Sequence, residues 1–336
     1  MTERRGDTLL FHTPPVIAAQ AAVGGKKESE GPLAAGFDEL TTDNRLGQCS
    51  WEAAEKQLQL RAARLCLQKA GLPAEQVDLA LAGDLQAQCT ASGYALRELG
   101  VPFAGLFGAC STMAEALALG AALCSSGAAQ NLLAMTSSHF CAAERQFRTP
   151  LSYGAVRTPT AQWTATAAGC TILSAQGPGP YLTHVTCGKI VDKGVTDANN
   201  MGAAMAPAAY DTLRAFFTDT KTGPADYDAI FTGDLGELGH EIVTDFFRQD
   251  GVDMTKNYFD CGMLLYDREK QDMHAGGSGC GCSAAVFNGY LLTGLKQGRW
   301  RRILFAPTGA LLSPTSSFQG ESIPGICHLV CVSTER

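Results

Sequence analysis

Apolar residues recur at helical spacing between Trp51 and Gly71, with Leu58, Ala62 and Leu65 among them. A face of this kind packs against a core while the opposite face meets water. Gly71 and the Leu72-Pro73 that follows it are typical of a helix end. The pattern therefore predicts a surface helix over this segment.

Short apolar runs lie between the helical segments, at residues 77–83, 103–107 and 131–135. Runs of this length between helices are typical of buried parallel strands. Alternating strands and helices predict an α/β fold.

The chain also contains an internal repeat. Residues 77–85 recur 150 positions later as residues 227–235, with Asp, Gly, Asp and Leu at matching places. At an offset of 172, Cys110 and the helical segment after it align with Cys282 and its own segment. Chance similarity between two strand-helix-strand units is the alternative, but two matches in the same order favour a duplication.

The duplication predicts two α/β halves, residues 1–175 and 176–336. A chain of 336 residues also exceeds what one core usually holds. Right-handed crossovers would then give two sheets related by a pseudo-twofold axis, with helices between and outside them. The first half carries Cys110, and the second carries a glycine-rich loop at 276–281.

Composition excludes several functions. The chain has 26 Lys and Arg against 33 Asp and Glu, a formal net charge of −7, and no basic run. Binding of nucleic acid needs a concentrated basic face, so we expect no nucleic-acid partner. The glycine-rich loop lacks the Lys-Ser/Thr of a phosphate loop, so we expect no nucleotide and no other cofactor.

The thirteen cysteines are scattered, and their odd number argues against a fully paired disulfide framework. Cys280 and Cys282 lack a second Cys/His pair, so we expect no metal site. No apolar run approaches the roughly 18 residues that span a bilayer. We therefore expect a cytoplasmic-type soluble chain from a reducing compartment, with any membrane association peripheral.

Cys110 is the candidate nucleophile. It follows a strand-like run and begins a helix, with Ser111 and Thr112 as capping groups. Backbone N–H groups and the positive end of a helix dipole lower the pKa of a thiol placed there. The same position also suits a small buried residue at a tight turn, and spacing alone does not separate the two interpretations.

The turn at Cys110 and the internal duplication resemble thiolases and ketoacyl synthases. Seven strings in this sequence further resemble the stage V sporulation protein AD family within that superfamily. They are residues 82–85, 107–112, 136–139, 143–148, 205–209, 275–280 and 310–314.

This resemblance implies a five-layer αβαβα fold with two pseudo-symmetric halves and a homodimer formed through the Cys110 half. It implies binding of dipicolinic acid (pyridine-2,6-dicarboxylate), alone or with calcium, and participation in its uptake into the developing spore. Other stage V sporulation membrane proteins would be partners, at the forespore or spore inner membrane. It implies no catalytic turnover.

The sequence departs from working condensing enzymes at one place. In ketoacyl synthases of the initiating type, the strand equivalent to residues 228–232 ends in a catalytic His. In this sequence Gly233-Asp234 occupies that place. Loss of a general acid-base group commonly costs about 10²- to 10⁴-fold in rate. His274 begins a turn that loosely resembles the thiolase His-Pro-x-Gly-x-Ser-Gly turn, but the turn is one residue shorter and lacks the Pro. An ordinary loop histidine is the other interpretation.

Two functional classes remain beside binding. Cys110 would serve an acyl-transfer or condensing enzyme, and a purely structural scaffold would need neither pocket nor thiol. The missing His at Gly233 favours the binding protein.

A dianionic ligand needs positive charge and backbone amides. His139 follows the run that ends at Met135, and Arg145 and Arg148 lie just beyond it, although both arginines also suit a solvated helix face paired with Glu144. We expect the glycine-rich loop at 276–281 to approach the pocket opposite Cys110. The predicted ligand-binding residues are Cys110, His139, Arg145, Arg148, Gly277, Ser278 and Gly279.

Overall fold

The structure is a computed structural model that describes residues 2–147 and 157–336. In the first half the main strands are β3 (Val16–Gly24), β5 (Leu79–Gly83), β6 (Phe103–Gly105), β7 (Asn131–Ser138) and β9 (Ala167–Ser174). In the second half they are β10 (Tyr181–Thr186), β11 (Ala229–Gly233), β12 (Tyr258–Asp260), β14 (Arg302–Ala310) and β16 (Leu329–Ser333).

The two sets of strands repeat one topology. Their order is β6-β5-β7-β9-β3 in the first half and β12-β11-β14-β16-β10 in the second. The first three strands of each set are parallel, and the fourth and fifth are antiparallel to their neighbours. The fold is therefore α/β with two pseudo-symmetric halves.

The sequence predicted two separate sheets, whereas the structure joins them along one hydrogen-bonded path. The join is the single residue pair Tyr181 and Val16. Backbone hydrogen bonds from Ile17 to Pro180 and from Leu182 to Pro15 flank it, at 2.8 and 2.9 Å. Strand β2 (Thr8–Phe11) also pairs with β10 at three residue pairs. The boundary drawn between residues 175 and 176 stays a prediction.

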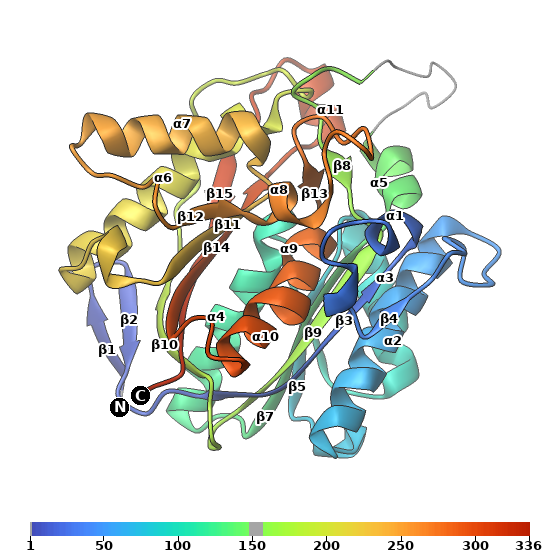
Figure 1. Ribbon diagram of the computed structural model, residues 1–336. Helices are drawn as coiled ribbons and strands as arrows, with labels where there is room; N and C mark the ends of the chain where they lie inside the picture. Colours follow the sequence, from blue (N-terminus) through green and yellow to red (C-terminus); the bar gives the residue numbers. More distant parts are fainter. Residues whose placement is uncertain (1, 148–156) are drawn as a thin grey trace.

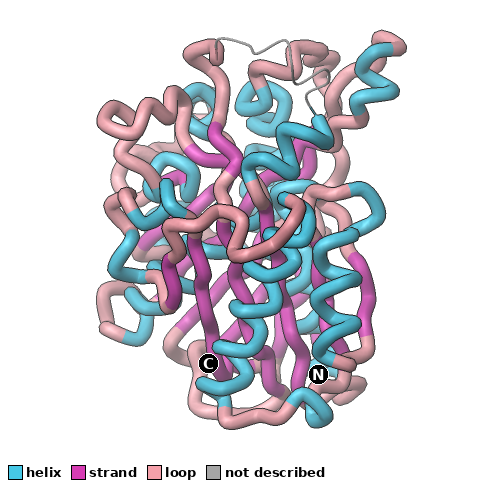
Figure 2. The backbone as a smooth tube through the Cα atoms, turned by 90° about the vertical axis from the view of Figure 1, so that its right-hand side faces the viewer, coloured by secondary structure: helices cyan, strands magenta, loops and turns pink. Residues whose placement is uncertain are grey.

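The helices form three layers around the strands (Figure 1). Helices α2 (Trp51–Ala70) and α3 (Thr90–Leu99) cover the outer face of the first half, and α6 (Met201–Thr220) and α7 (Gly236–Gln249) cover the second. The central layer holds α4 (Thr112–Ser126), α9 (Cys280–Val286), a π-turn (Phe287–Leu291) and α10 (Leu292–Lys296). Figure 2 shows the same layers turned by a quarter, with the outer helices of the first half in front of the strands.

The remaining elements are short. The strands are β1 (Thr2–Arg5), β2 (Thr8–Phe11), β4 (Glu39–Leu40), β8 (Trp163–Thr164), β13 (Gly277–Ser278) and β15 (Gly325–Cys327). The helices are α1 (Lys26–Ser29), α5 (Phe140–Phe147), α8 (Cys261–Leu265) and α11 (Pro314–Phe318).

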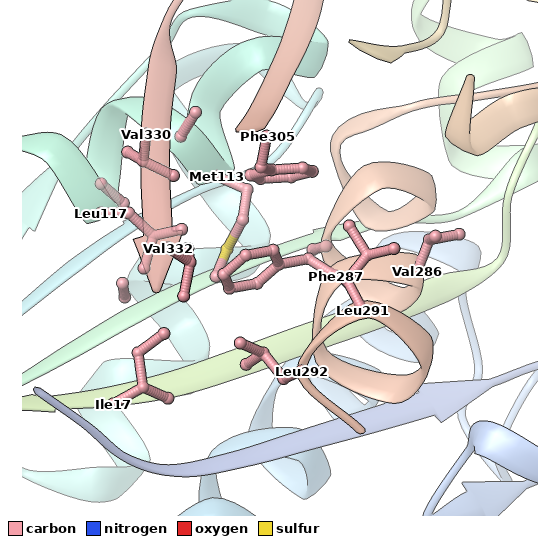
Figure 3. Packing of buried hydrophobic residues seen from close by; sticks show 14 of the residues in the cluster. Ile17, Met113, Leu117, Val286, Phe287, Leu291, Leu292, Phe305, Val330 and Val332 are labelled. Carbon is pink, nitrogen blue, oxygen red and sulfur yellow. The ribbon is translucent and has the colours of Figure 1, made fainter. Parts of the chain in front are cut away.

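The central core lies between the two sets of strands (Figure 3). Met113 and Leu117 of α4 pack there with Phe287 of the π-turn and Phe305 of β14, all fully or almost fully buried. The Phe287 and Phe305 rings stack at 4.5 Å between centroids. Burial of each such side chain contributes about 1.5–3 kcal/mol. This core fixes the two central helices against each other.

The predicted surface helix is confirmed as α2. Ser50 accepts a hydrogen bond from the Ala53 backbone N–H at its start, and Gly71 ends it with φ of 62°. The strand predicted at residues 131–135 continues to Ser138. Its last three residues are polar but buried, because β9 pairs with the whole of β7.

One helical stretch, Ala109–Ser126, is long and apolar enough to cross a membrane by length and composition. It is the central helix α4 with the turn before it, and 67% of the stretch is buried within the protein. Core packing accounts for its apolar character.

Candidate functional site

A strained turn holds Cys110 at the start of α4. Ala109 has φ of 49°, a left-handed conformation that costs a non-glycine residue about 1–2 kcal/mol. The Thr112 hydroxyl donates to the Ala109 carbonyl at 2.6 Å and accepts from the Gly108 N–H at 3.0 Å. The Ser111 hydroxyl donates back to the Gly108 carbonyl instead of capping the helix. These hydrogen bonds fix the position of the thiol.

The glycine-rich loop lies next to Cys110. Gly277 and Ser278 form β13, which runs parallel to β8. Gly279 has φ of 100° and turns the chain into α9. The Gly279 N–H and the Ser278 hydroxyl both lie within reach of the Cys110 thiol. Strands of the first half and the loop of the second half therefore meet at this point.

A cavity of about 830 Å³ opens beside Cys110. Cys110 and Ser278 form part of its wall, and most of the remainder is apolar and aromatic. Among the apolar wall residues are Phe107, Phe140, Phe147, Trp163, Met205 and Leu312. The Phe140 and Trp163 rings stack at 3.8 Å between centroids. A volume of this size is within the range of small-molecule sites, about 300–1,000 Å³.

Arg157 is the one basic residue on this wall within the described part of the chain. Its guanidinium Nη2 donates to the Asp272 carboxylate at 2.7 Å, and its charged group lies 5.2 Å from the centre of the Trp163 ring. Its Nη1 is buried and has no hydrogen-bond partner among the described residues. A buried guanidinium N–H without an acceptor is a binding position for an anion.

His274 contacts Asp272, the carboxylate that also pairs with Arg157. Its Nδ1 donates to the Thr158 carbonyl at 2.7 Å, and its Nε2 lies 3.1 Å from the Asp272 carboxylate. The ring faces this ion pair, and His274 is not among the residues that line the cavity. The structure therefore places His274 beside the partner of Arg157 and gives it no position on the wall.

Asp234 follows Gly233 at the end of β11, in the Gly233-Asp234 pair that stands where the resemblance expects a catalytic His. Its φ is 68°, its side chain is fully buried, and neither carboxylate oxygen has a partner with hydrogen-bond geometry among the described residues. The carboxyl lies beside the Cys110 thiol. Burial raises the pKa of Asp234 well above its usual range.

Of the two interpretations of Cys110 left open by the sequence, the structure favours the buried residue at a tight turn over the thiol of lowered pKa. Burial, followed by the charge of Asp234 and its contact with the thiol, raises the pKa of Cys110 well above the ordinary value. The Gly279 N–H and the Ser278 hydroxyl act in the other direction but are outweighed. The sequence predicts the helix start at Cys110, but it does not predict that the Asp234 carboxyl lies beside the thiol.

The predicted positive groups lie away from the wall. The His139 ring is buried, its Nε2 is bonded to the Asn44 carbonyl at 2.8 Å, and burial lowers its pKa, which favours the uncharged form. Arg145 is exposed and pairs with Glu52 at 3.3 Å. Neither lines the cavity, and nor do Gly277 and Gly279. Arg148 lies outside the described residues, so its predicted role stays a prediction.

The comparisons with known proteins decide the family. Residues 5–333 match the model of the stage V sporulation protein AD family (SpoVAD). The chain belongs to this family. Stage V sporulation protein AD of Bacillus subtilis (strain 168) is 44% identical over 322 residues, which are 96% of this chain and 95% of that protein. Membership supports a role in sporulation.

Solved structures of condensing enzymes share the fold. The 3-oxoacyl-[acyl-carrier-protein] synthase III of Aquifex aeolicus VF5 has a TM-score of 0.59 at 13% identity, with 95% of this chain and 99% of that chain covered. Cerulenin-bound OleA of Xanthomonas campestris has a TM-score of 0.60 at 16% identity, with 98% and 99% covered. The thiolase-like αβαβα fold is therefore confirmed, and these distant likenesses show the fold alone.

Arg157 and Trp163 were missed by the sequence analysis. Arg157 lies in a polar stretch, Arg157-Thr-Pro-Thr160, without helical or strand periodicity. Its acceptor Asp272 is 115 positions away. The one local signal was an arginine shortly before an aromatic residue, which is too common to indicate a site.

The structure also bears on disulfide bonds and on metal binding. All thirteen cysteines lie in the described part of the chain and are free thiols. Within residues 2–147 and 157–336, no group of three or more His, Cys, Asp and Glu side chains is placed to hold a metal.

Proposed function

We propose that this protein binds dipicolinic acid non-covalently in the cavity beside Cys110 and takes part in its uptake into the developing spore. The observation that carries the proposal is the buried Nη1 of Arg157, which has no hydrogen-bond partner among the described residues, on a mostly apolar wall that also carries Glu144. A planar pyridine ring suits such a wall, and its carboxylates suit a guanidinium.

The energetics favour a ligand with an anionic group at this position. A carboxylate that enters a partly dry cavity loses hydration, and a charge-assisted donor offsets that loss. Arg157 is already held by Asp272 and lies against Trp163, so little side-chain freedom remains to be lost on binding. The remaining cavity volume leaves room for calcium or water to accompany the ligand.

The proposal includes no catalysis. Asp234, next to Cys110, offers no imidazole for proton transfer, and the surroundings of Cys110 keep its thiol protonated. The second candidate is an acyl-transfer or condensing enzyme that uses Cys110. The observation in its favour is the position of that thiol on the wall of a large apolar cavity.

The proposal also covers the location of the protein and its partners. We place the protein peripherally on the forespore or spore inner membrane, with other stage V sporulation membrane proteins, and as a homodimer. Edge strand β6 exposes 39% of Phe103, and the neighbouring α3 exposes 48% of Tyr94. An edge strand with exposed aromatic residues suits a second copy of the chain. Light scattering on the wild type and on Phe103→Asp tests this, since only the wild type should have the mass of a dimer.

One experiment separates the two candidate functions. The protein is mixed with dipicolinic acid and, separately, with acyl-CoA, and both heat and covalent mass gain are measured. We expect saturable heat and no mass gain with dipicolinic acid, and no acylated protein with acyl-CoA. An acyl group on Cys110 that turns over, together with no heat from dipicolinic acid, would establish the enzyme instead.

A further inference from the structure

The Asp234 side chain is directed inward by its backbone. The Gln162 side chain donates to the Asp234 carbonyl, and Thr308 donates to the carbonyl of Gly233 just before it. These bonds hold Asp234 at its left-handed φ of 68°, an unfavourable conformation for a residue other than glycine. The carboxyl is consequently buried without an acceptor or donor in hydrogen-bond geometry among the described residues.

Among the described residues, the titratable groups that act with this carboxyl are acids. They are Cys110, Cys282 of α9, Asp260 at the end of β12, Cys261 of α8 and Tyr266. Cys280, also in α9, packs with Cys110 in one small apolar cluster. Among the described groups that act most strongly on Cys110 there is no cation. A thiolate at Cys110 would therefore add negative charge to a dry site that has nothing to balance it.

We propose that Asp234 is a positioning residue that keeps Cys110 protonated, so that the thiol on the cavity wall does not react with thioesters or other electrophiles. This role holds whichever molecule occupies the cavity. When the Asp234 carboxyl is ionised, its charge repels a thiolate at Cys110. When the carboxyl is protonated, it cannot act as a base, because it already holds a proton. In both states Asp234 fails to take the proton from Cys110, which an imidazole at this place would do.

Alkylation without ligand tests the proposal. The Cys110 thiolate attacks the methylene carbon of iodoacetamide, a carbon–sulfur bond forms and iodide leaves, and peptide mass spectrometry follows each cysteine. Rates are measured from pH 6 to pH 10 for the wild type, Asp234→Asn and Asp234→His. Exposed Cys49 is an internal reference within every sample.

We expect the wild-type rate at Cys110 to rise up to the highest pH without reaching a plateau. Asp234→Asn should react about tenfold faster or more at the pH values where the wild-type carboxyl is ionised, since one unit of thiol pKa changes the thiolate fraction tenfold. Asp234→His should also level off at a lower pH, because an imidazolium stabilises the thiolate. The Cys49 rate should be the same in all three proteins.

Equal Cys110 rates and profiles in the three folded proteins would overturn the proposal. If Asp234→His does not fold, Asp234→Asn, which keeps the size of the side chain, decides: a Cys110 profile equal to that of the wild type would overturn the proposal, and a faster reaction would support it. Because no ligand is present, failure of this test leaves the result of the dipicolinic acid titration unaffected.

Discussion

Arg157 lines the cavity and donates from Nη2 to the Asp272 carboxylate at 2.7 Å, while its buried Nη1 has no partner among the described residues. One half of the guanidinium is therefore fixed to the protein and the other half remains available. The Trp163 ring below it, at 5.2 Å, limits its movement further. This arrangement holds a donor in place before any ligand arrives, which reduces the entropy lost on binding.

The first prediction concerns Arg157. Arg157→Ala should weaken dipicolinic acid binding by about 2–5 kcal/mol, because a buried carboxylate loses its charge-assisted donor. Arg157→Lys should restore only part of the affinity, since an ammonium cannot reproduce the planar fork. Isothermal titration calorimetry measures both.

Arg145→Ala is the matched control, because Arg145 is exposed and outside the wall. Its affinity should equal that of the wild type. A loss at Arg145 with none at Arg157 would instead support the assignment made from sequence.

The second prediction concerns the ligand. Pyridine-2-carboxylic acid should bind more weakly than dipicolinic acid if the second carboxylate also contacts the wall, for example at Ser278. Added salt should weaken binding only modestly, because buried contacts are little screened. Calorimetry with both acids at two salt concentrations measures this, and equal affinities would show that one carboxylate is not recognised.

The third prediction concerns pH and stability. Burial and the nearby Asp84 raise the pKa of Glu55 from 4.5 to about 8. Because the folded pKa is the higher one, its contribution to stability is complete below pH 4.5 and is lost as the pH rises through about 8. The free energy of unfolding of the wild type should therefore fall over this range.

Glu55→Gln keeps the shape and stays neutral, so its stability should fall less between pH 5 and pH 8. Urea unfolding at both pH values, followed by circular dichroism, gives the difference. The same pH dependence in both proteins would show that Glu55 is ionised in the fold.

The fourth prediction concerns close packing at the start of α9. A Cβ on Gly281 would lie 2.2 Å from the Ala167 carbonyl oxygen and 2.6 Å from the Ser138 nitrogen. Gly281→Ala should destabilise the protein by about 1–3 kcal/mol, because backbone must move. Gly93→Ala in α3, where nothing lies within 4 Å of the new Cβ, should stabilise it by about 0.5–1 kcal/mol. Thermal unfolding compares the two, and an unchanged midpoint for Gly281→Ala would contradict the tight contact.

Features encoded locally could be predicted from the sequence. The helix at Trp51–Ala70 and the strand of residues 79–83 follow from apolar spacing and from a glycine stop. The position of Cys110 at the start of a helix is likewise local. The family resemblance depended on short strings of the same kind, and the family match confirms it.

Features set by tertiary contacts could not be predicted. His139 does follow β7, but its ring is bonded to Asn44, 95 positions away, instead of facing the cavity. The pKa of Cys110 depends on Asp234, which reaches the thiol from the other half of the chain. The basic group on the wall is Arg157, whose stretch has no periodicity. Each of these three features depends on contacts between side chains that are far apart in the sequence. The spacing of apolar and polar residues does not determine such contacts.

The central claim is that dipicolinic acid occupies the cavity beside Cys110 without bonding to it. A crystal structure of the protein grown with dipicolinic acid tests this most directly. The account predicts ligand density inside the cavity, one carboxylate within hydrogen-bond distance of the Arg157 Nη1, and a free Cys110 sulfur. Density for the ligand only outside this cavity, or for an adduct on Cys110, would contradict it.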